Sequence, residues 1–466
     1  MIYDFLLLNK KCGTPLYIQL YHKIKTAIES GALQHGQRLP SIRRLSGDLG
    51  LSKTTVESAY EQLCVEGYIK NMPQRGFFVQ AQSHSHPEEA RVKAGAGQKA
   101  AQPPAVIRYD LSSRSVDTNA TNLKLWRKYV RDVLNCEYLI NSYGDPQGEP
   151  ELRKALASYC YGVRGVVAEE SRIIIGAGTQ SLLYMICGLL RDCHKTVAME
   201  TNGSRHAMQV FSDCGLPVQT IESDGDGILP QKLYDSGADI LLINPSGSLK
   251  TGQSIRMNRR YELLDWAQEE NHVIIEDDYN GELRYNTRPI PALQGHDSKH
   301  VIYLGSFSKL LLPSVRIGYA VLPQNLAKRF EKSAEFYNQT ASKTEQLALA
   351  RYIRDGQLER HLRRQRMRYG EKSALLTAML KKYMPYAMQI QLLETSLAVK
   401  VTLREELDPV LFHDKLARNG VKIVSDGVQD RHSFKLGFSG IETEKIESAV
   451  ALISDIIKTH PRKDAH

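Results

Sequence analysis

A stretch with almost no large apolar side chain, from Gln82 to Pro104, sets the organisation of this chain. It is built of Ala, Gly, Pro, His and charged residues, so it cannot bury enough apolar surface to offset the entropy of ordering it. We therefore predict a flexible linker at residues 81–106, between a small unit at residues 1–80 and a body at residues 107–466. The length of 466 residues leaves room for more than one core. His84 and His86 lack a nearby third ligand, so we predict no metal site.

Positive charge is concentrated in the small unit. Residues 1–80 contain ten Lys or Arg and six acidic residues, which gives +4 of the total formal charge of +9. The remaining 386 residues therefore carry +5. A small basic unit on a nearly balanced body suggests a polyanionic partner, although a solvated surface would give the same count.

Neither membrane insertion nor secretion is indicated. The longest nearly apolar run, residues 182–190, is about half the length of a membrane-spanning helix. Asp4 precedes the apolar residues near the N-terminus and lysines follow them, which is the wrong order for a secretory signal. The seven cysteines include no C-x-x-C pair, which favours reduced thiols. We expect a cytoplasmic protein with no membrane partner.

Three helices are predicted before the linker. Apolar residues recur at helical spacing over residues 18–28, and Ser41 and Ser52 each cap a further short helix, with Gly50 in the turn between them. Two short helices joined by a tight glycine turn make a helix-turn-helix. The β-rich segments 68–70 and 76–79 then resemble the two strands of a wing.

This arrangement predicts contacts with DNA. In a helix-turn-helix the start of the second helix faces base edges in the major groove, and flanking basic residues reach phosphates. A protein-interaction module with solvated arginines is the alternative. The candidate DNA contacts lie on both helices and on the wing: Arg43, Arg44, Ser52, Lys53, Thr54, Thr55 and Arg75.

The body alternates strand and helix signals. This alternation predicts an α/β fold with a mostly parallel sheet, followed by helices from about Asn325 and a smaller α+β lobe at the C-terminus. The expected strands are residues 172–175, 196–199, 239–243, 272–276 and 301–304 in the large part, and 397–401 and 434–438 in the lobe.

The segment Ser306-Phe307-Ser308-Lys309, with Arg316 after it, is the most informative chemical motif. A lysine that leaves a strand end can form an imine with an aldehyde, while the two hydroxyls and the arginine hold a phosphate. An ordinary surface lysine is the alternative for this string alone.

Two other elements suit the same ligand. Asp277 and Tyr279 follow a buried strand and point to one side, with Asp278 on the other. A carboxylate on a pyridine nitrogen and a phenol on the ring oxygen are what a pyridoxal ring needs, although a strand-end cap would also explain the aspartate. The glycine-rich turn with Gly178, Thr179 and Gln180 offers backbone N–H groups at a helix N-terminus to a phosphate. Together the three elements point to pyridoxal 5′-phosphate.

The N-terminal unit closely resembles the winged helix of GntR-type bacterial transcription regulators. The wing departs from the family pattern, because Gln74 replaces the first glycine of Gly-x-Gly. The matching motifs are Gly36-x-x-Leu39-Pro40-Ser41-x-Arg43-x-Leu45, Leu49-Gly50-Leu51-Ser52-Lys53-x-Thr55-Val56 and Tyr60-x-x-Leu63-x-x-Glu66-Gly67-Tyr68.

From about Ile107 to its end the chain resembles fold-type-I aminotransferases, through the three elements above, residues 143–148 and Asn244-Pro245. The resemblance implies an internal aldimine at Lys309, Asp277 on the pyridine nitrogen, and Tyr279 with Asn244 on the ring oxygen. It also implies a phosphate site made of Gly178, Thr179, Gln180, Ser306, Ser308 and Arg316, with Tyr143 reaching the phosphate of a partner subunit.

A GntR-type winged helix fused to such a body resembles the MocR subfamily. This implies a head-to-tail homodimer that binds operator DNA and senses a small amino compound or pyridoxal phosphate itself. The ligand side departs from the subfamily: Ser204 replaces an aromatic residue, residues 245–252 differ, and Lys435 replaces the arginine that grips a carboxylate. Arg205, His206 and Lys435 are candidates for the acid group of the effector.

Two other functions are compatible with these motifs. The chain could be a working aminotransferase with an appended DNA-binding domain, or a DNA-binding protein whose body is only a scaffold. Two residues, Gly247 and Lys435, argue against efficient transamination. The argument against a scaffold is that four residues are intact: Lys309, Asp277, Tyr279 and Arg316. We therefore expect a sensor without physiological turnover.

Overall fold

The computed structural model describes residues 8, 13–80, 107–112, 116–117, 121–201, 203–247, 254–287, 289–424 and 431–459. The chain divides into two compact units, Met1–Gln102 and Pro103–His466. The expected linker at 81–106, with His84 and His86, lies outside the described residues. Within the described ranges no helix is long and apolar enough to cross a membrane, and no three His, Cys, Asp or Glu side chains are grouped to hold a metal ion.

The N-terminal unit is a winged helix-turn-helix. Ser41 and Ser52 accept hydrogen bonds from the backbone N–H groups of Arg44 and Thr55, so both predicted caps are present. Gly50 has a left-handed backbone (φ 61°) in the turn between the two helices. Its elements are α1 (Leu16–Glu29), α2 (Ile42–Leu49), α3 (Lys53–Val65) and the antiparallel strands β1 (Ile69–Met72) and β2 (Gly76–Val79).

The buried face of α1 differs slightly from the apolar spacing that predicts this helix, which is Ile18, Tyr21, Ile24 and Ile28. Leu20 and Ala27 complete the buried face of α1, whereas Ile18 and Tyr21 are only half-buried. The Tyr60 hydroxyl donates to the backbone of Pro40 at 3.0 Å, which ties α3 to the segment before α2.

The wing turn contains the departure from the family pattern. Gln74 has a φ of 61° and Gly76 a φ of 95°. A non-glycine residue in the left-handed region costs about 1 kcal/mol, so the glutamine is strained where the family has glycine. The guanidinium of Arg75 lies 5.7 Å from the centroid of the Phe78 ring.

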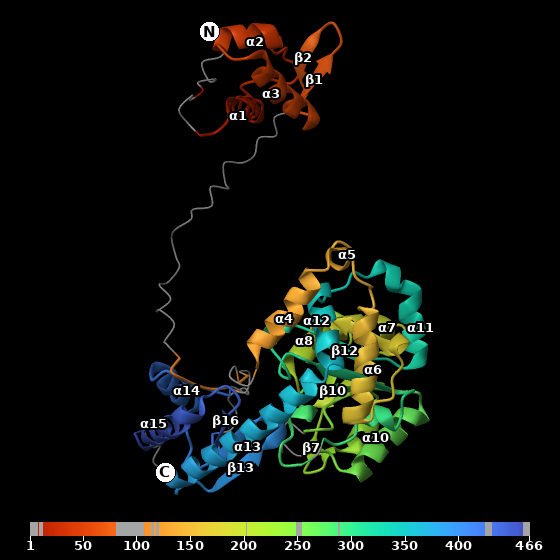
Figure 1. Cartoon of the computed structure of the whole chain (residues 1–466), viewed down its shortest axis with the longest axis vertical. Helices are drawn as coiled ribbons and strands as arrows, with labels where there is room; N and C mark the ends of the chain where they lie inside the picture. Colours follow the sequence, from red (N-terminus) through yellow and green to blue (C-terminus); the bar gives the residue numbers. More distant parts are fainter. Residues whose placement is uncertain are drawn as a thin grey trace. The chain divides into compact units, whose positions relative to one another are not determined.

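A seven-stranded sheet forms the centre of the body (Figure 1). All neighbouring strands are parallel except β12, which runs antiparallel to both of its neighbours. The predicted α/β class with a mostly parallel sheet is therefore confirmed. In spatial order the strands are β4 (Ile173–Gly176), β12 (Gly318–Val321), β11 (Val301–Ser306), β10 (Val273–Asp278), β9 (Ile240–Ile243), β5 (Val197–Glu200) and β6 (Val218–Ile221).

Helices cover both faces of this sheet. Alternation along β10 sends Ile275 into a core with α7 and α8, and Ile274 into a core with α10. The helices of this part are α4 (Leu123–Leu134), α5 (Glu137–Ile140), α6 (Pro150–Arg164), α7 (Thr179–Leu190), α8 (Arg205–Asp213), α9 (Pro230–Asp235), α10 (Met257–Glu269), α11 (Gln324–Ser333), α12 (Lys343–Arg354) and the long α13 (Gln357–Tyr383).

The predicted C-terminal lobe is also present. Its three-stranded antiparallel sheet has the order β13-β14-β16, and a further strand pairs in parallel with the start of the body. The elements are β13 (Gln389–Leu393), β14 (Ala398–Thr402), β16 (Ser433–Gly437), α14 (Pro409–Arg418), α15 (Ile446–Lys458), and β15 (Val421–Ile423) beside β3 (Tyr109–Leu111).

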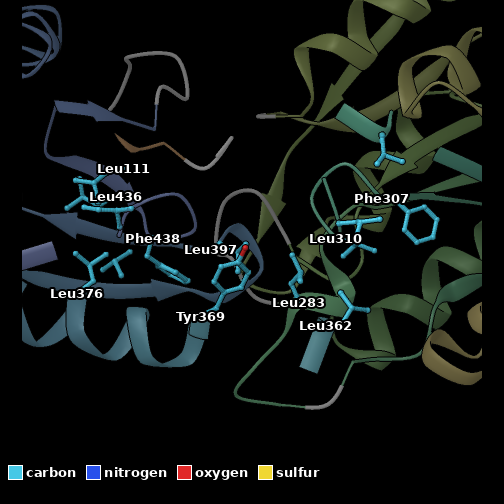
Figure 2. Packing of buried hydrophobic residues seen from close by; sticks show 14 of the residues in the cluster. Leu111, Leu283, Phe307, Leu310, Leu362, Tyr369, Leu376, Leu397, Leu436 and Phe438 are labelled. Carbon is cyan, nitrogen blue, oxygen red and sulfur yellow. The ribbon is translucent and has the colours of Figure 1, made fainter. Parts of the chain in front are cut away.

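One hydrophobic core joins the large part of the body to this lobe (Figure 2). Phe307 and Leu310, which follow β11, belong to it together with Leu362 on α13. Leu376 on the same helix and Phe438 after β16 extend it into the lobe. The segment after β11 is thus anchored in a core that spans both parts of the body.

Candidate cofactor site and nucleic-acid interface

The candidate cofactor site lies where the parallel strands of the large sheet end, and we call this side of the sheet its C-terminal edge. The strands β4, β5, β9, β10 and β11 are parallel, so their C-terminal ends share this edge, the usual ligand-binding edge of such sheets. Because β12 runs the opposite way, it begins at the same edge, and Arg316 lies just before its first residue. Sequence segments more than a hundred residues apart therefore meet here.

Lys309 occupies the segment after β11. Its Nζ lies 5.0 Å from the centroid of the Tyr279 ring, so the structure brings these two predicted residues together. Phe307 and Leu310 on either side of it are fully buried, and the backbone oxygen of Leu310 is 2.9 Å from Nε2 of His361. The lysine is held by anchors on both sides of it while its own side chain is only half-buried.

Asp277 is the last residue but one of β10, and its carboxyl lies close enough to Lys309 for their charges to interact. Its Oδ1 is shielded from solvent and has no hydrogen-bond partner among the described residues. The pKa of this carboxyl is raised to about 7, chiefly by burial and also by the charge of Asp278, while the charge of Lys309 acts to lower it. The carboxyl group is therefore poised to receive a positively charged partner.

These residues fit pyridoxal 5′-phosphate. Buried carboxylate oxygens normally have partners, so an unpartnered one beside a lysine needs explanation. A protonated pyridine nitrogen would pair with the Asp277 carboxylate, and the Lys309 amine could react with the aldehyde to form an imine.

Gly178, which precedes α7, forms a cradle together with Arg316 and Ser308. Its φ of 91° and ψ of 177° suit glycine alone, and an added Cβ would lie 2.9 Å from Nη2 of Arg316. Arg316 in turn donates to Oγ of Ser308 at 3.4 Å and to the backbone oxygen of Ala177 at 3.4 Å. The N–H groups at the start of α7 point from the same turn, as helix N-termini do.

Close backbone packing holds this cradle together. A Cβ on Gly318 would lie 3.0 Å from the backbone carbon of Gly178, so β12 and the α7 turn touch directly. The N–H of Ser308 donates to Oγ of Ser306 at 3.3 Å. The structure thus collects the predicted phosphate residues at one place: Gly178, Thr179, Gln180, Ser306, Ser308 and Arg316.

Arg316 itself has a left-handed backbone, with a φ of 50°. Such strain in a non-glycine residue persists only where its surroundings enforce it, and it concentrates at functional sites. The backbone of this arginine therefore supports the same assignment as its side chain.

A buried polar network lies on the opposite side of β10 from Asp277. Nε of Arg164 is 2.7 Å from Oδ2 of Asp278, and neither side chain is more than 1% exposed. Arg164 also donates to Oγ of Ser246 at 2.6 Å, and the Tyr303 hydroxyl donates to Asp278 at 2.9 Å. No sequence motif marks Arg164, Ser246 or Tyr303, and the doubled acid at the end of β10 is the one sequence signal that a buried cation must be near.

Two further predicted cofactor residues are placed less directly. Asn244 lies after β9, and its Oδ1 accepts the backbone N–H of Ser246 at 3.0 Å, so it is tied to its own turn. Tyr143 is fully exposed in the segment before α6.

The candidate effector residues are spread over two elements. Arg205 and His206 are exposed at the start of α8, where Ser204 accepts the N–H of Ala207 at 3.3 Å and caps the helix. This cap explains what the serine does in place of an aromatic residue. Lys435 is half-buried in β16, directly opposite Lys400 of β14. Residues 248–253, which include most of the departure at 245–252, lie outside the described residues.

The candidate DNA contacts lie on the surface of the N-terminal unit. Arg43, Arg44, Lys53, Thr54 and Arg75 are exposed. Oγ of Ser52 lies 2.8 Å from the Thr54 hydroxyl and 2.7 Å from the Thr55 hydroxyl. Since Ser52 also caps α3, its first role is to fix the helix start that would enter a groove.

Comparison with known proteins identifies the family of each of the two units. Residues 16–79 match the family of bacterial regulatory proteins of the gntR type, and residues 110–453 match aminotransferase class I and II. The uncharacterized HTH-type transcriptional regulator YhdI of Bacillus subtilis is 39% identical over 82% of this chain and 82% of its own. The probable rhizopine catabolism regulatory protein MocR of Rhizobium meliloti is 28% identical over 96% of this chain and 94% of its own.

A solved archaeal alanine:glyoxylate aminotransferase superposes on the body with a TM-score of 0.67, at 22% identity, over 75% of this chain and 90% of that one. At this identity the likeness establishes the fold of the body alone. With a GntR domain at its N-terminus and a class I and II aminotransferase domain over most of its length, the chain belongs to the MocR-type subfamily of GntR-type regulators.

Proposed function

We propose that this chain is a pyridoxal-phosphate-dependent, DNA-binding transcription regulator that senses an amino compound or the cofactor itself. The observation that carries the proposal is the group of residues at the C-terminal edge of the large sheet. There a lysine and a shielded carboxylate without a partner among the described residues lie beside an anion cradle at a helix N-terminus. In this proposal the winged helix binds the operator and the body binds the ligand that is sensed.

We assign a task to each residue at this edge. The Lys309 amine would hold the aldehyde carbon, and Asp277 would keep the pyridine nitrogen protonated. Tyr279 and Asn244 would contact the ring oxygen, and the cradle would hold the phosphate. When bound, the cofactor supplies a reactive aldehyde on an electron-withdrawing ring. An effector amine would compete with Lys309 for that aldehyde.

Absorbance and cofactor retention test the covalent site. Purified wild-type protein should carry a visible absorbance band that survives dialysis, and Lys309→Ala should lose it. Arg316→Gln, which keeps the lysine but weakens the phosphate cradle, should bind the cofactor more weakly. Retention of the dialysis-resistant band by Lys309→Ala would remove the covalent site from the proposal.

Binding to promoter DNA tests the regulator function. Affinity for a fragment from upstream of the gene should fall steeply with salt, because phosphate contacts release counterions. Arg43→Ala should weaken this binding and leave the absorbance spectrum unchanged. If wild-type protein shifts no upstream fragment at low salt, the regulator function is wrong.

We also propose a head-to-tail homodimer in which Tyr143 reaches the phosphate of the partner subunit. Supporting this, Tyr143 is fully exposed, and Tyr138 and Ile140 on α5 are exposed apolar side chains close to it in sequence. Light scattering should give twice the mass of one chain. Tyr143→Phe should weaken cofactor binding without dissociating the dimer.

The identity of the effector can be approached by spectral titration. Addition of GABA, D-alanine or taurine to the cofactor-loaded protein should shift the visible band if that amine is the effector. If none does so, pyridoxal phosphate becomes the preferred signal. Absence of accumulating keto product in the same samples would support sensing without turnover.

A further inference from the structure

A strongly basic surface lies on the body, outside both the cofactor site and the winged helix. We call it the α4–α13 basic surface. Eight of its side chains are exposed and that of Arg351 is half-buried. It consists of Lys124, Arg127, Lys128 and Arg131 on α4, Arg351 and Arg354 on α12, and Arg360, Arg363 and Arg364 on α13.

Helix α12 contacts both α4 and α13, so the three helices are neighbours in the body (Figure 1). Trp126 and Tyr129 of α4 pack edge-on against Tyr352 of α12, with ring centroids 5.7 Å and 5.4 Å apart. The Tyr129 hydroxyl donates to Asp355, in the turn between α12 and α13, at 2.7 Å. The apolar side of α4 therefore faces α12, which leaves its basic side outward.

Spacing places the charges on one side of each helix. The four basic residues of α4 and the three of α13 recur at intervals of three and four residues, the spacing of a single helix face. Like charges at this spacing repel one another. These residues lie on solvent-exposed helix faces, where packing would allow any polar side chain. The repulsion among them is therefore not a consequence of how the helices pack.

Few acidic groups offset these charges. Arg354 has a distant pairing with Asp355, at 3.6 Å, and none of the other eight forms an ion pair within the described ranges. The segments 123–134 and 351–364, which contain the nine cations, include three acidic residues, Asp132, Asp355 and Glu359, so together they carry a net charge of +6. That exceeds the net +5 of all residues after position 80, so the rest of the body is close to neutral.

We propose that the α4–α13 basic surface binds the phosphate backbone of DNA next to the operator. This inference rests on the proposed regulator function. Seven of the nine cations are arginines, whose planar guanidinium can bind phosphate oxygens in pairs. A DNA-binding unit on the same chain brings this polyanion within reach, because the 26 residues between Gln80 and Ile107 span at most about 95 Å.

Contacts of this kind position DNA and do not select its sequence. The surface would therefore add affinity for operator and unrelated DNA alike, and it would steepen the dependence on salt. Base selection would remain with the winged helix. In this way the body would hold DNA while it senses its ligand.

The test uses two triple variants of the full-length protein: Arg360→Gln/Arg363→Gln/Arg364→Gln on α13, and Lys124→Gln/Arg127→Gln/Lys128→Gln on α4. The control, Lys232→Gln/Lys328→Gln/Lys332→Gln, removes the same charge from exposed lysines elsewhere on the body. Anisotropy would measure affinity for a long promoter fragment at several salt concentrations, and light scattering would measure the mass of each protein.

Each surface triple should weaken DNA binding about tenfold or more at 0.1 M salt and reduce the slope of log K against log salt by at least about 1, since each lost phosphate contact contributes about 0.9. The control triple should change neither.

Unchanged affinity and slope in both surface triples would overturn the inference, with the proposed function intact. A change of mass in these variants would also overturn it, because the surface would then be an interface between copies. If even the wild-type protein binds no DNA, the proposed function fails instead.

Discussion

At the scale of single residues, Asp277 is held in an environment that opposes its charge. Its carboxyl has a pKa of about 7 in the folded chain, well above that of an exposed aspartate, chiefly because it is buried. A group whose pKa is raised on folding binds protons more tightly in the folded state. Stability of the cofactor-free chain should therefore fall as pH rises from about 4 to 7.

Asp277→Asn should consequently stabilise the cofactor-free protein. We expect the free energy of unfolding to rise by about 1–3 kcal/mol at pH 8, because a shielded carboxylate without a partner is replaced by a neutral amide. The gain should shrink as pH is lowered from 7 toward 4. Denaturant unfolding at several pH values measures it, and a variant that is less stable than wild type at pH 8 would contradict the assignment.

The same substitution should weaken cofactor binding, because the amide cannot pair with a protonated ring nitrogen. Asp277→Glu keeps the charge and serves as the comparison. A variant that gains stability and loses cofactor affinity would show that the protein tolerates an unfavourable buried group for its function.

Arg164 is the second residue whose substitution should change the free energy of unfolding of the body. Breaking a buried pair leaves an uncompensated charge, so Arg164→Met should cost about 3–5 kcal/mol of unfolding free energy. The double variant Arg164→Met/Asp278→Asn should recover part of this loss, since both charges are then removed. Asp278→Asn alone completes the comparison, and a double variant whose loss equals the sum of the two single losses would show that Arg164 and Asp278 are not coupled.

Residue-level chemistry was predictable from sequence only in part. Lys309, Asp277 and Arg316 could be proposed because each occupies a recognisable motif. The partner of Asp278 could not, because Arg164 lies 114 residues away on α6 and nothing local marks it. Long-range pairs of this kind depend on how helices pack against the sheet.

At the scale of elements, α3 depends on its cap. Ser52→Ala should cost the N-terminal unit about 1 kcal/mol, as the loss of an N-cap usually does. Ser41→Ala removes the same kind of cap from α2 and is the matched control. Both should destabilise this unit to a similar degree, measured by hydrogen exchange of its amides.

The two cap variants should differ in DNA binding. Ser52 fixes the start of α3 and aligns the Thr54 and Thr55 hydroxyls, whereas Ser41 fixes the start of α2. Operator affinity should therefore fall more in Ser52→Ala than in Ser41→Ala. Equal losses in the two variants would mean that stability alone, and not the position of α3, controls binding.

Elements with strong apolar patterns were predicted within one or two residues, and two strands of the large sheet were not predicted. Residues 318–321 of β12 contain glycine and alanine, which have low strand propensity. Their strand character comes from pairing with β4 and β11. The other strand, β6, lies at the edge of the sheet and exposes two of its four residues, so it has no apolar run.

At the scale of the whole molecule, the two units should respond separately to the cofactor. Both tryptophans, Trp126 and Trp266, belong to the body, so tryptophan fluorescence reports its unfolding and not that of the winged helix. A ligand that binds only the folded body stabilises it by about 2.7 kcal/mol at a hundredfold excess over its dissociation constant. For a domain of this size that corresponds to a rise of about 3–6 °C in its midpoint.

We therefore expect pyridoxal phosphate to raise the midpoint of the tryptophan transition while hydrogen exchange of the α1, α2 and α3 amides stays unchanged. Pyridoxal, which lacks the phosphate, should have a much smaller effect, because the cradle of Gly178, Ser308 and Arg316 has nothing to hold. Equal stabilisation by the two compounds would remove the phosphate cradle from the site. Equal protection of both units by pyridoxal phosphate would instead show that they unfold as one, and that cofactor binding is coupled to the winged helix without any effector.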